Sequence, residues 1–285
     1  MPIGTRFVEL HATISSPIKI INDIFVKCFF KRRKFNSKVH FFMVSKNQIK
    51  LITSLQQKKF RQIHKLFIAE GVKVIQELLD SNFVLEHLFV SEPILDSVNS
   101  SQKTIVTDAE LKKISCLATP NNCLALFTIP EAKLPIQKGL VVALDSIRDP
   151  GNLGTIIRLC DWFGIEELWC SEQTADVYNP KVVQATMGSI SRVKVVYMDL
   201  EKQLQKVSIP VFGTFMDGKN VYQENLPKEG ILVLGNEANG ISKNIEKLVS
   251  DRLAIPRYGS LQQTESLNVA TATAIFLSEF KRTTI

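Results

Sequence analysis

The sequence predicts an α/β protein with two domains. Three observations support this: a globular composition, an alternation of strand-like and helix-like segments, and one segment that interrupts this alternation. The chain has 285 residues, 45% hydrophobic and 22% charged, which is a globular composition long enough for two domains. From residue 43 onward, short apolar runs alternate with stretches of helical periodicity. Prolines and lysines in 130–139 interrupt both patterns. We therefore expect one domain at 43–130, a linker at 131–139 and a second domain at 140–285.

A basic segment, residues 1–42, precedes these domains. It contains eight lysines and arginines against two acids, so it supplies +6 of the net charge of +7, and the rest of the chain is nearly neutral. Whole-chain basicity is therefore a poor argument for a nucleic-acid partner. Charged residues interrupt its apolar run, whereas a membrane span needs about 20 predominantly apolar residues, so no membrane association is expected. We expect an N-terminal extension, either disordered or upstream of the native start; the alternative is a basic RNA-binding arm.

The first domain is expected to be a small open sheet with helices on its faces. Residues 45–65 place apolar side chains at roughly helical spacing among six basic residues and no acid, which predicts a basic amphipathic helical start. This basic face either binds phosphates or is simply solvated. Further along the chain, the pattern predicts helices at 71–79 and 108–114, and strands at 65–69, 85–90, 104–106 and 123–129.

The second domain is expected to contain a parallel sheet that is covered on both faces. Short runs rich in β-branched residues occur without polar alternation, which is typical of strands buried on both faces. These runs lie at 140–145, 167–170, 193–196, 210–215 and 230–235. A last helix at 268–281 carries apolar and small residues throughout, so it is expected to pack against the body of the domain.

Two classes of site are disfavoured by the residue patterns. The five cysteines and four histidines are dispersed without C-x-x-C spacing, so neither a zinc site nor a disulfide framework is indicated, and a reducing cytoplasm is expected. No G-x-G-x-x-G follows a strand, which argues against a dinucleotide-dependent oxidoreductase. We therefore expect neither a metal nor a nicotinamide cofactor.

Three segments of the second domain join a strand end to a loop of small or polar residues. In LDSIRDPGNLGTIIRLCDWFG, a strand runs into a loop and then a helix that carries Arg158. GILVLGNEANGIS ends a strand at Gly235, and RLAIPRYGSLQQTESLNVATATAIF leads through a proline turn to a helix that starts near Asn268. Each alone fits an ordinary turn or helix cap. Open α/β sheets, however, bind ligands at the carboxyl ends of their strands.

Together and in this order, the three segments resemble the signature motifs of the SpoU/TrmH type of SPOUT methyltransferases. The segment VYNPKVVQATMGSISRV is also similar to that family, and residues 45–130 resemble the substrate-binding domain that often precedes it. The resemblance implies a parallel sheet with a C-terminal trefoil knot, a homodimer, and S-adenosylmethionine as cofactor. It implies methylation of a ribose 2′-hydroxyl in RNA, with ribosomal RNA favoured over transfer RNA. The alternative is a non-catalytic RNA-binding or ribosome-assembly factor of the same fold.

The resemblance also assigns residues by position. It implies three catalytic residues, namely Arg158, Glu237 and Asn268. It implies cofactor contacts, several of them through backbone atoms, from Thr214, Gly235, Ile255, Ser266 and Leu267. RNA contacts are expected from Asn152 in the substrate loop and, on the basic helical start, from Lys46, Lys50, Lys58, Lys59 and Arg61. The chain departs from the family twice, because SLQQT lengthens the third motif and Gln184 stands where many relatives carry arginine.

Overall fold

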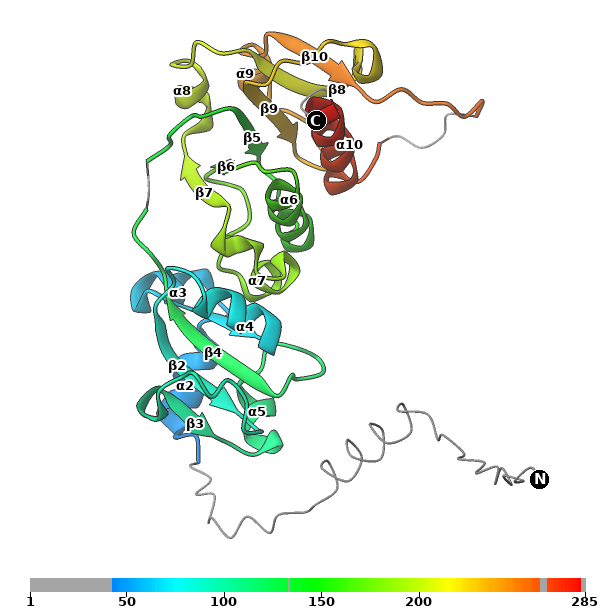
Figure 1. The fold of residues 1–285 in the computed structure, drawn as a ribbon. Coiled ribbons are helices and arrows are strands. Elements are labelled where there is room, and N and C mark those ends of the chain that lie inside the picture. Colours follow the sequence, from blue (N-terminus) through cyan, green and yellow to red (C-terminus); the bar gives the residue numbers. More distant parts are fainter. Residues whose placement is uncertain (1–42, 133, 262–265, 283–285) are drawn as a thin grey trace, which may run out of the picture. The chain divides into compact units, whose positions relative to one another are not determined.

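The computed structural model describes residues 43–132, 134–261 and 266–282, whose arrangement is shown in Figure 1. The expected N-terminal extension at 1–42 lies outside the described residues, as does the part of the lengthened loop within 262–265. The described strands form a sheet of four and a sheet of six, both accompanied by helices. The predicted α/β class is confirmed.

The first sheet has the strand order β1-β4-β2-β3. Its strands are β1 (Leu66–Glu70), β2 (Leu85–Val90), β3 (Lys103–Ile105) and β4 (Cys123–Thr128). β4 pairs antiparallel with β1 and β2, and β3 pairs parallel with β2. All four strands were predicted from the sequence. β4 is buried along almost its whole length, as its uninterrupted apolar run predicts.

The basic start of this domain forms two helices, α2 (Lys46–Ser54) and α3 (Lys58–His64). A capping box begins α2, since the Ser45 hydroxyl accepts from the Gln48 backbone N–H and the Gln48 side chain accepts from the Ser45 N–H. The left-handed Lys65, with φ of 53°, ends α3. The other helical elements of this domain are α4 (Val72–Leu79), α5 (Asp108–Ile114) and the 3₁₀ turn η1 (Ser100–Gln102).

The second sheet is parallel throughout, with the order β10-β8-β9-β5-β6-β7. Its strands are β5 (Leu140–Asp145), β6 (Glu167–Ser171), β7 (Lys194–Met198), β8 (Val211–Asn220), β9 (Gly230–Gly235) and β10 (Asp251–Ala254). Every residue of β5 is buried, which follows from its central place and the helices on both faces. The apolar runs of the sequence therefore predicted this sheet well.

The helices of the second sheet are α6 (Pro150–Trp162), α7 (Pro180–Thr186), α8 (Leu200–Leu204), α9 (Lys243–Glu246) and α10 (Val269–Arg282), with η2 (Ser189–Ser191) and η3 (Val221–Gln223). α10 packs against α6, and Figure 1 shows these two helices side by side. α6 and α7 approach closely because Gly154 has no side chain: a Cβ there would lie 2.4 Å from the Cβ of Ala185. α8 and α9 contribute to a separate apolar cluster with Val141 and Trp169.

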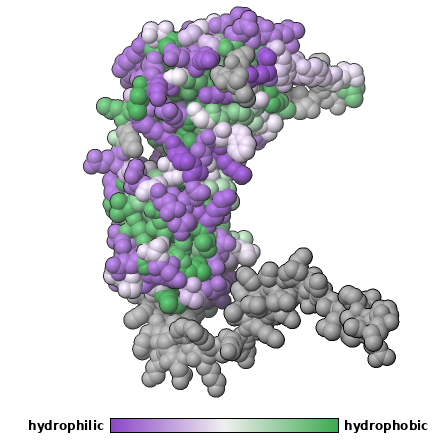
Figure 2. All heavy atoms as spheres, in the orientation of Figure 1, coloured by the Kyte–Doolittle hydropathy of each residue, from purple (hydrophilic) through white to green (hydrophobic). Residues whose placement is uncertain are grey.

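A continuous cluster of buried hydrophobic residues includes side chains of both sheets, for example Phe67 of β1 and Leu144 of β5. On the face seen in Figure 2, hydrophilic side chains interrupt the hydrophobic ones, which is the usual mixture of a folded surface. Among the described residues, no helix has the length and apolar character required to span a membrane.

Candidate active site

The candidate site lies where β5 and β9 end. These neighbouring strands pair in parallel register, with Asp145 opposite Gly235, so the loops that follow them start side by side. The loop after β5 leads into α6, whose N-terminus is capped by Asp149: its carboxylate accepts from the backbone N–H of Asn152 at 2.7 Å. The loop after β9 forms a small hairpin closed by two backbone hydrogen bonds between Asn236 and Gly240. The first two sequence motifs are thereby brought together.

Two side chains fasten these loops to each other. The buried Asp145 carboxylate accepts from the backbone N–H of Ser242 at 2.7 Å. Asn236 donates from its side-chain amide to the carbonyl of Ser146 at 2.7 Å, while its amide oxygen accepts two backbone N–H groups within the hairpin. Neither residue was singled out from the sequence, although each is a polar residue at a strand end. They hold the loops so that the more exposed polar residues keep their positions.

Asn152, Glu237 and Asn268 form one hydrogen-bonded chain, although they come from three different motifs. The Asn268 side-chain amide donates to Asn152 Oδ1 at 2.9 Å, and Asn152 Nδ2 donates to Glu237 Oε1 at 3.0 Å. Asn268 also begins α10, because its Oδ1 accepts from the backbone N–H of Ala270 at 2.9 Å. Glu237 and Asn268 are exposed, so this polar cluster is open to a substrate.

A cavity of about 1100 Å³ lies beside the polar cluster, between the hairpin, the middle of β8 and the segment after β10. All five residues expected to contact a cofactor line it, namely Thr214, Gly235, Ile255, Ser266 and Leu267. Glu237 belongs to both the cavity and the polar cluster, so it connects the two. Several lining side chains are apolar and exposed, including Tyr258 at 81% and Leu261 at 80%. An apolar surface of this kind gains free energy when a ligand covers it.

Gly235 has a structural reason to be glycine. A Cβ at this position would lie 2.2 Å from the backbone of Gly240 and Ile241. Because the end of β9 packs directly on the hairpin backbone, any side chain there would push the hairpin away. Glycine at this position is therefore required for the close contact between β9 and the hairpin.

The wall of the cavity also contains residues that the sequence did not single out. The guanidinium of Arg252 lies 3.5 Å from the centre of the Phe215 ring and forms ion pairs with Asp217 and Glu246, each at 2.5 Å. The hydrogen bond from Arg252 lowers the pKa of the Asp217 carboxyl. These contacts hold the Arg252 side chain in one position at the polar side of the cavity. Arg252 begins the third motif, but its stacking partner is far away in sequence and carries no signal of its own.

The remaining predicted residues lie away from the polar cluster. Arg158 is exposed on α6 and makes no hydrogen bond or ion pair with any residue in the described ranges. Of the expected RNA contacts on α2 and α3, four are exposed, namely Lys46, Lys50, Lys58 and Lys59.

Arg61 differs from the expectation. Its side chain is only 2% exposed, and it donates to the carbonyls of Leu55 and Gln56 and to the carboxylate of Asp176. Because these acceptors already occupy the guanidinium, Arg61 is not available to a phosphate, and the predicted RNA contact at this position is wrong.

The close packing at Gly235 gives a testable expectation. Gly235→Ala should displace the hairpin and weaken the binding of S-adenosylmethionine, the expected ligand, by roughly 5- to 150-fold, because overpacking of this kind typically costs 1–3 kcal/mol. Isothermal calorimetry with purified protein measures this directly.

Gly259→Ala is the matched control. Gly259 lines the same cavity, but a Cβ there meets no described atom within 4 Å, so affinity should stay within about twofold. Equal affinity in both variants would contradict the assigned geometry of the hairpin.

Comparison with known proteins matches each half of the chain to a protein family. Residues 139–278 match the SpoU rRNA methylase family, and residues 46–125 match the MRM3-like substrate-binding domain. The chain is 31% identical over 241 residues to the 23S rRNA (guanosine(2553)-2′-O)-methyltransferase RlmP of Bacillus subtilis, covering 82% of this chain and 96% of that protein.

Solved structures give the same result. A candidate RNA methyltransferase of the TrmH family from Porphyromonas gingivalis superposes with a TM-score of 0.78 and 39% identity, covering 85% of this chain and all of that one. An AdoMet-bound rRNA methyltransferase from Sinorhizobium meliloti superposes with a TM-score of 0.74 and 27% identity, covering 83% and 95% of the two chains. With its motifs, its site geometry and these likenesses in agreement, the chain belongs to the SpoU rRNA methylase family.

Proposed function

We propose that this protein transfers the methyl group of S-adenosylmethionine to a ribose 2′-hydroxyl of ribosomal RNA. The observation that carries this proposal is the meeting of three motifs: Asn152, Glu237 and Asn268 form a polar cluster at the edge of the large cavity. The Bacillus relative is named for the same modification of 23S rRNA, and the Sinorhizobium structure contains the cofactor. A 2′-hydroxyl is the group that distinguishes RNA from DNA.

The cavity suits S-adenosylmethionine in both size and chemistry. Its volume of about 1100 Å³ is at the large end of small-molecule sites. Exposed apolar residues such as Tyr258 and Leu261 would cover an adenine ring, while Glu246 and the backbone of Gly235 face the same space. When bound there, the cofactor would supply an electrophilic methyl group. The chain itself must then align a ribose with that group and assist removal of one proton.

Alignment is the larger part of this task, because holding two reactants in near-attack geometry supplies roughly 7–11 kcal/mol. The Asn152–Glu237 hydrogen bond fixes two polar side chains beside the cavity, where they would orient the ribose. Arg158 is a poor general base, because a guanidinium carries only N–H donors and offers no acceptor for a proton. We therefore assign it to the developing alkoxide or to the neighbouring phosphate, with the proton leaving through phosphate, Glu237 or water.

The position of Arg158 favours a homodimer with a shared active site. It follows Asn152 by six residues on α6, so the two side chains point about 120° apart around the helix and lie about 9 Å apart along it. Arg158 therefore faces away from the polar cluster of its own chain. It shares an exposed helical face with Thr155 and with Trp162, whose exposure is 83%. We propose that this face packs on a second copy and carries Arg158 to that copy's ribose site.

We further propose that the segment after β9 is threaded as a trefoil knot, as the family resemblance implies. β10 lies at the sheet edge beside β8, and the chain then returns to α10, which packs on α6.

We retain residues 43–130 as the RNA-binding domain, 131–139 as the linker and 140–285 as the methyltransferase domain. We also propose that the protein acts in the cytoplasm, because its dispersed cysteines fit a reducing compartment.

Arg158→Ala tests the catalytic assignment. Loss of a group that stabilises developing charge typically lowers kcat by about 10²–10³-fold. Cofactor affinity should be unchanged, because Arg158 is not among the residues that line the cavity. The assay is transfer of labelled methyl to ribosomal RNA from a strain lacking the gene. Lys206→Ala, at an exposed position without an assigned role, is the control.

A wild-type protein that binds RNA and cofactor but transfers no label would instead be a non-catalytic RNA-binding or assembly factor.

The exposed lysines of the first domain predict salt-dependent RNA binding. Lys58→Ala with Lys59→Ala should weaken binding and reduce the slope of log affinity against log salt by about 1.5–2, because each lysine that contacts a phosphate releases a counterion. Filter binding at several salt concentrations measures the slope. The matched pair Lys112→Ala with Lys113→Ala removes the same charge from α5 of the same domain. The assignment fails if both pairs reduce the slope equally.

Trp162→Ala tests the dimer. A central interface tryptophan typically contributes more than about 2 kcal/mol, so the dissociation constant of the dimer should rise at least about tenfold. Analytical ultracentrifugation reports this constant. Leu134→Ala changes a side chain of similar exposure, 85%, in the proposed linker and should leave the dimer intact. A wild-type protein that sediments as a monomer would refute the shared site.

A further inference from the structure

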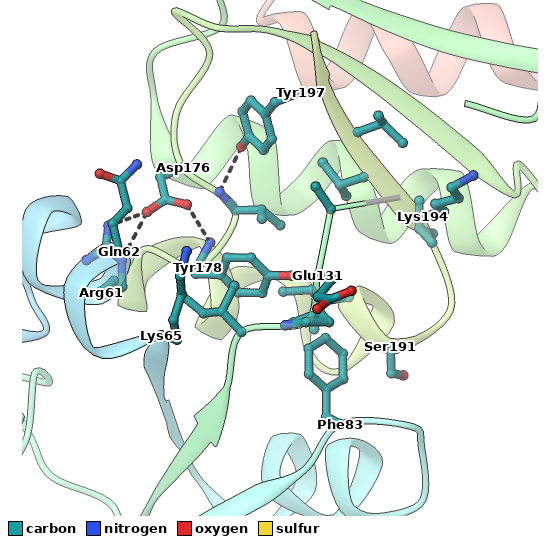
Figure 3. Close-up of a pocket in the computed structure, with 18 of the residues that line it drawn as sticks. Arg61, Gln62, Lys65, Phe83, Glu131, Asp176, Tyr178, Ser191, Lys194 and Tyr197 are labelled. Atoms are coloured by element: carbon teal, nitrogen blue, oxygen red, sulfur yellow. Dashed lines mark hydrogen bonds and ion pairs between the residues drawn. The ribbon is translucent and has the colours of Figure 1, made fainter. Parts of the chain in front are cut away.

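A largely buried ion pair joins the two proposed domains. Arg61 lies on α3, and Asp176 lies in the loop after β6, 115 residues later. Arg61 donates from Nη2 and Nε to Asp176 Oδ2, at 2.5 and 3.0 Å, and Figure 3 shows these bonds at the wall of a cavity of about 890 Å³. The two side chains are 2% and 16% exposed.

We infer that Arg61 and Asp176 are positioning residues for the methyl transfer, because their buried ion pair fixes the RNA-binding domain against the loop that supports the active site. This inference rests on the proposed function. It assigns to Arg61 a role that its charge and its place on a basic helix did not suggest.

Arg61 is held rigidly on its own domain. Its Nη1 donates to the carbonyls of Leu55 and Gln56, at 2.7 and 2.9 Å, which are the residues at the break between α2 and α3. A guanidinium with its donors engaged in a planar fork has little freedom to follow a moving partner. The ion pair therefore fixes an orientation rather than merely attracting the second domain.

Asp176 is held equally firmly by the methyltransferase domain. Its Oδ1 accepts from the backbone N–H of Tyr178 at 3.1 Å. The same loop is fastened from inside by Tyr197, whose hydroxyl donates to the carbonyl of Ala175 and accepts from the N–H of Val177. Figure 3 shows Tyr197 directed toward this loop.

The loop that holds Asp176 is hydrogen-bonded to the loop that holds the active site. The N–H of Ala175 donates to the carbonyl of Ile147 at 2.8 Å, and the N–H of Ser146 donates to the hydroxyl of Ser171 at 2.9 Å. Ser146 in turn accepts from Asn236, next to Glu237. A continuous series of contacts therefore links Arg61 to the polar cluster. Through it, the orientation of the first domain is fixed relative to the loops of the candidate active site.

Other contacts between the domains are weaker constraints. Arg192 pairs with Glu77 of α4 and with Asp161 of α6, but its side chain is 46% exposed. Exposed pairs of this kind contribute little. Phe67 packs on Tyr178 with ring centres 4.9 Å apart, which gives contact area without a fixed direction. The two domains also share a hydrophobic core, which holds them together without fixing a direction. The Arg61–Asp176 pair is therefore the most buried contact of fixed direction between them.

Asp176→Asn in the full-length chain is the main test, since it keeps the shape and removes the charge. With ribosomal RNA from a strain lacking the gene, the KM for RNA should rise so that kcat/KM drops at least about tenfold, because a displacement near 1 Å can cost 10²-fold. Methylation should also spread to neighbouring nucleotides. Cofactor affinity should be unchanged. Glu166→Gln is the matched control, because it removes one carboxylate from the exposed pair with Lys138 within the second half of the chain.

A merely structural role would leave the methylated position and the KM for RNA unchanged. Unchanged kcat/KM and position in Asp176→Asn, or a parallel loss of cofactor affinity, would overturn the inference. If that variant does not fold, Arg61→Lys decides: it keeps the charge but loses the fork, so a smaller rise in KM supports the inference and an unchanged KM refutes it.

A readout without catalysis separates this inference from the proposed function. Spin labels at Lys112→Cys and Lys206→Cys, in a chain with Cys28→Ser and Cys116→Ser, report the distance between the domains. Both label positions are exposed. A distance distribution that broadens in Asp176→Asn supports the positioning role even if wild-type protein transfers no methyl. A distribution as narrow as that of wild type contradicts it.

Discussion

The parallel pairing of β5 with β9 is the constraint on which the rest of the site depends. It sets Asp145 beside Gly235, so that two loops far apart in sequence leave the sheet at neighbouring points. Asp145 and Asn236 then fasten those loops to each other. Only with both loops fixed can Asn152 reach Glu237, and only with α10 packed on α6 can Asn268 reach Asn152. The polar cluster is thus a consequence of sheet register.

The same constraint explains how the chain can carry out methyl transfer with few charged groups. An in-line displacement needs the acceptor oxygen to be aligned with the methyl group more than it needs a strong base. The cluster supplies fixed dipoles and one carboxylate beside a large apolar cavity. The buried Arg61–Asp176 pair extends this positioning to the first domain, because it relates the surface that carries Lys58 and Lys59 to the loops at the end of β5. RNA bound by the first domain would then lie in a fixed position relative to the reacting group.

Local patterns predicted most of the fold because strands buried on both faces need continuous apolar runs, and β5 and β9 are both of this kind. The motifs also led to the cavity residues, since polar and small residues gather at strand ends. Arg61 could not be assigned correctly, because a basic residue on a basic helix gives no sign that a carboxylate 115 residues away will bury it. Arg252 and its stacking on Phe215 were missed for the same reason: the contact exists only after β8 and β10 have paired.

The most direct test of ribose methylation is alkaline hydrolysis of ribosomal RNA that the protein has labelled with methyl from S-adenosylmethionine. Alkali cleaves RNA through the free 2′-hydroxyl, so a ribose methylated at that oxygen protects the adjacent phosphodiester. If the protein methylates a ribose 2′-hydroxyl, the label will appear in an alkali-resistant dinucleotide from one position of the RNA. Label recovered in alkali-released mononucleotides would place the methyl group on a base and contradict the proposed reaction.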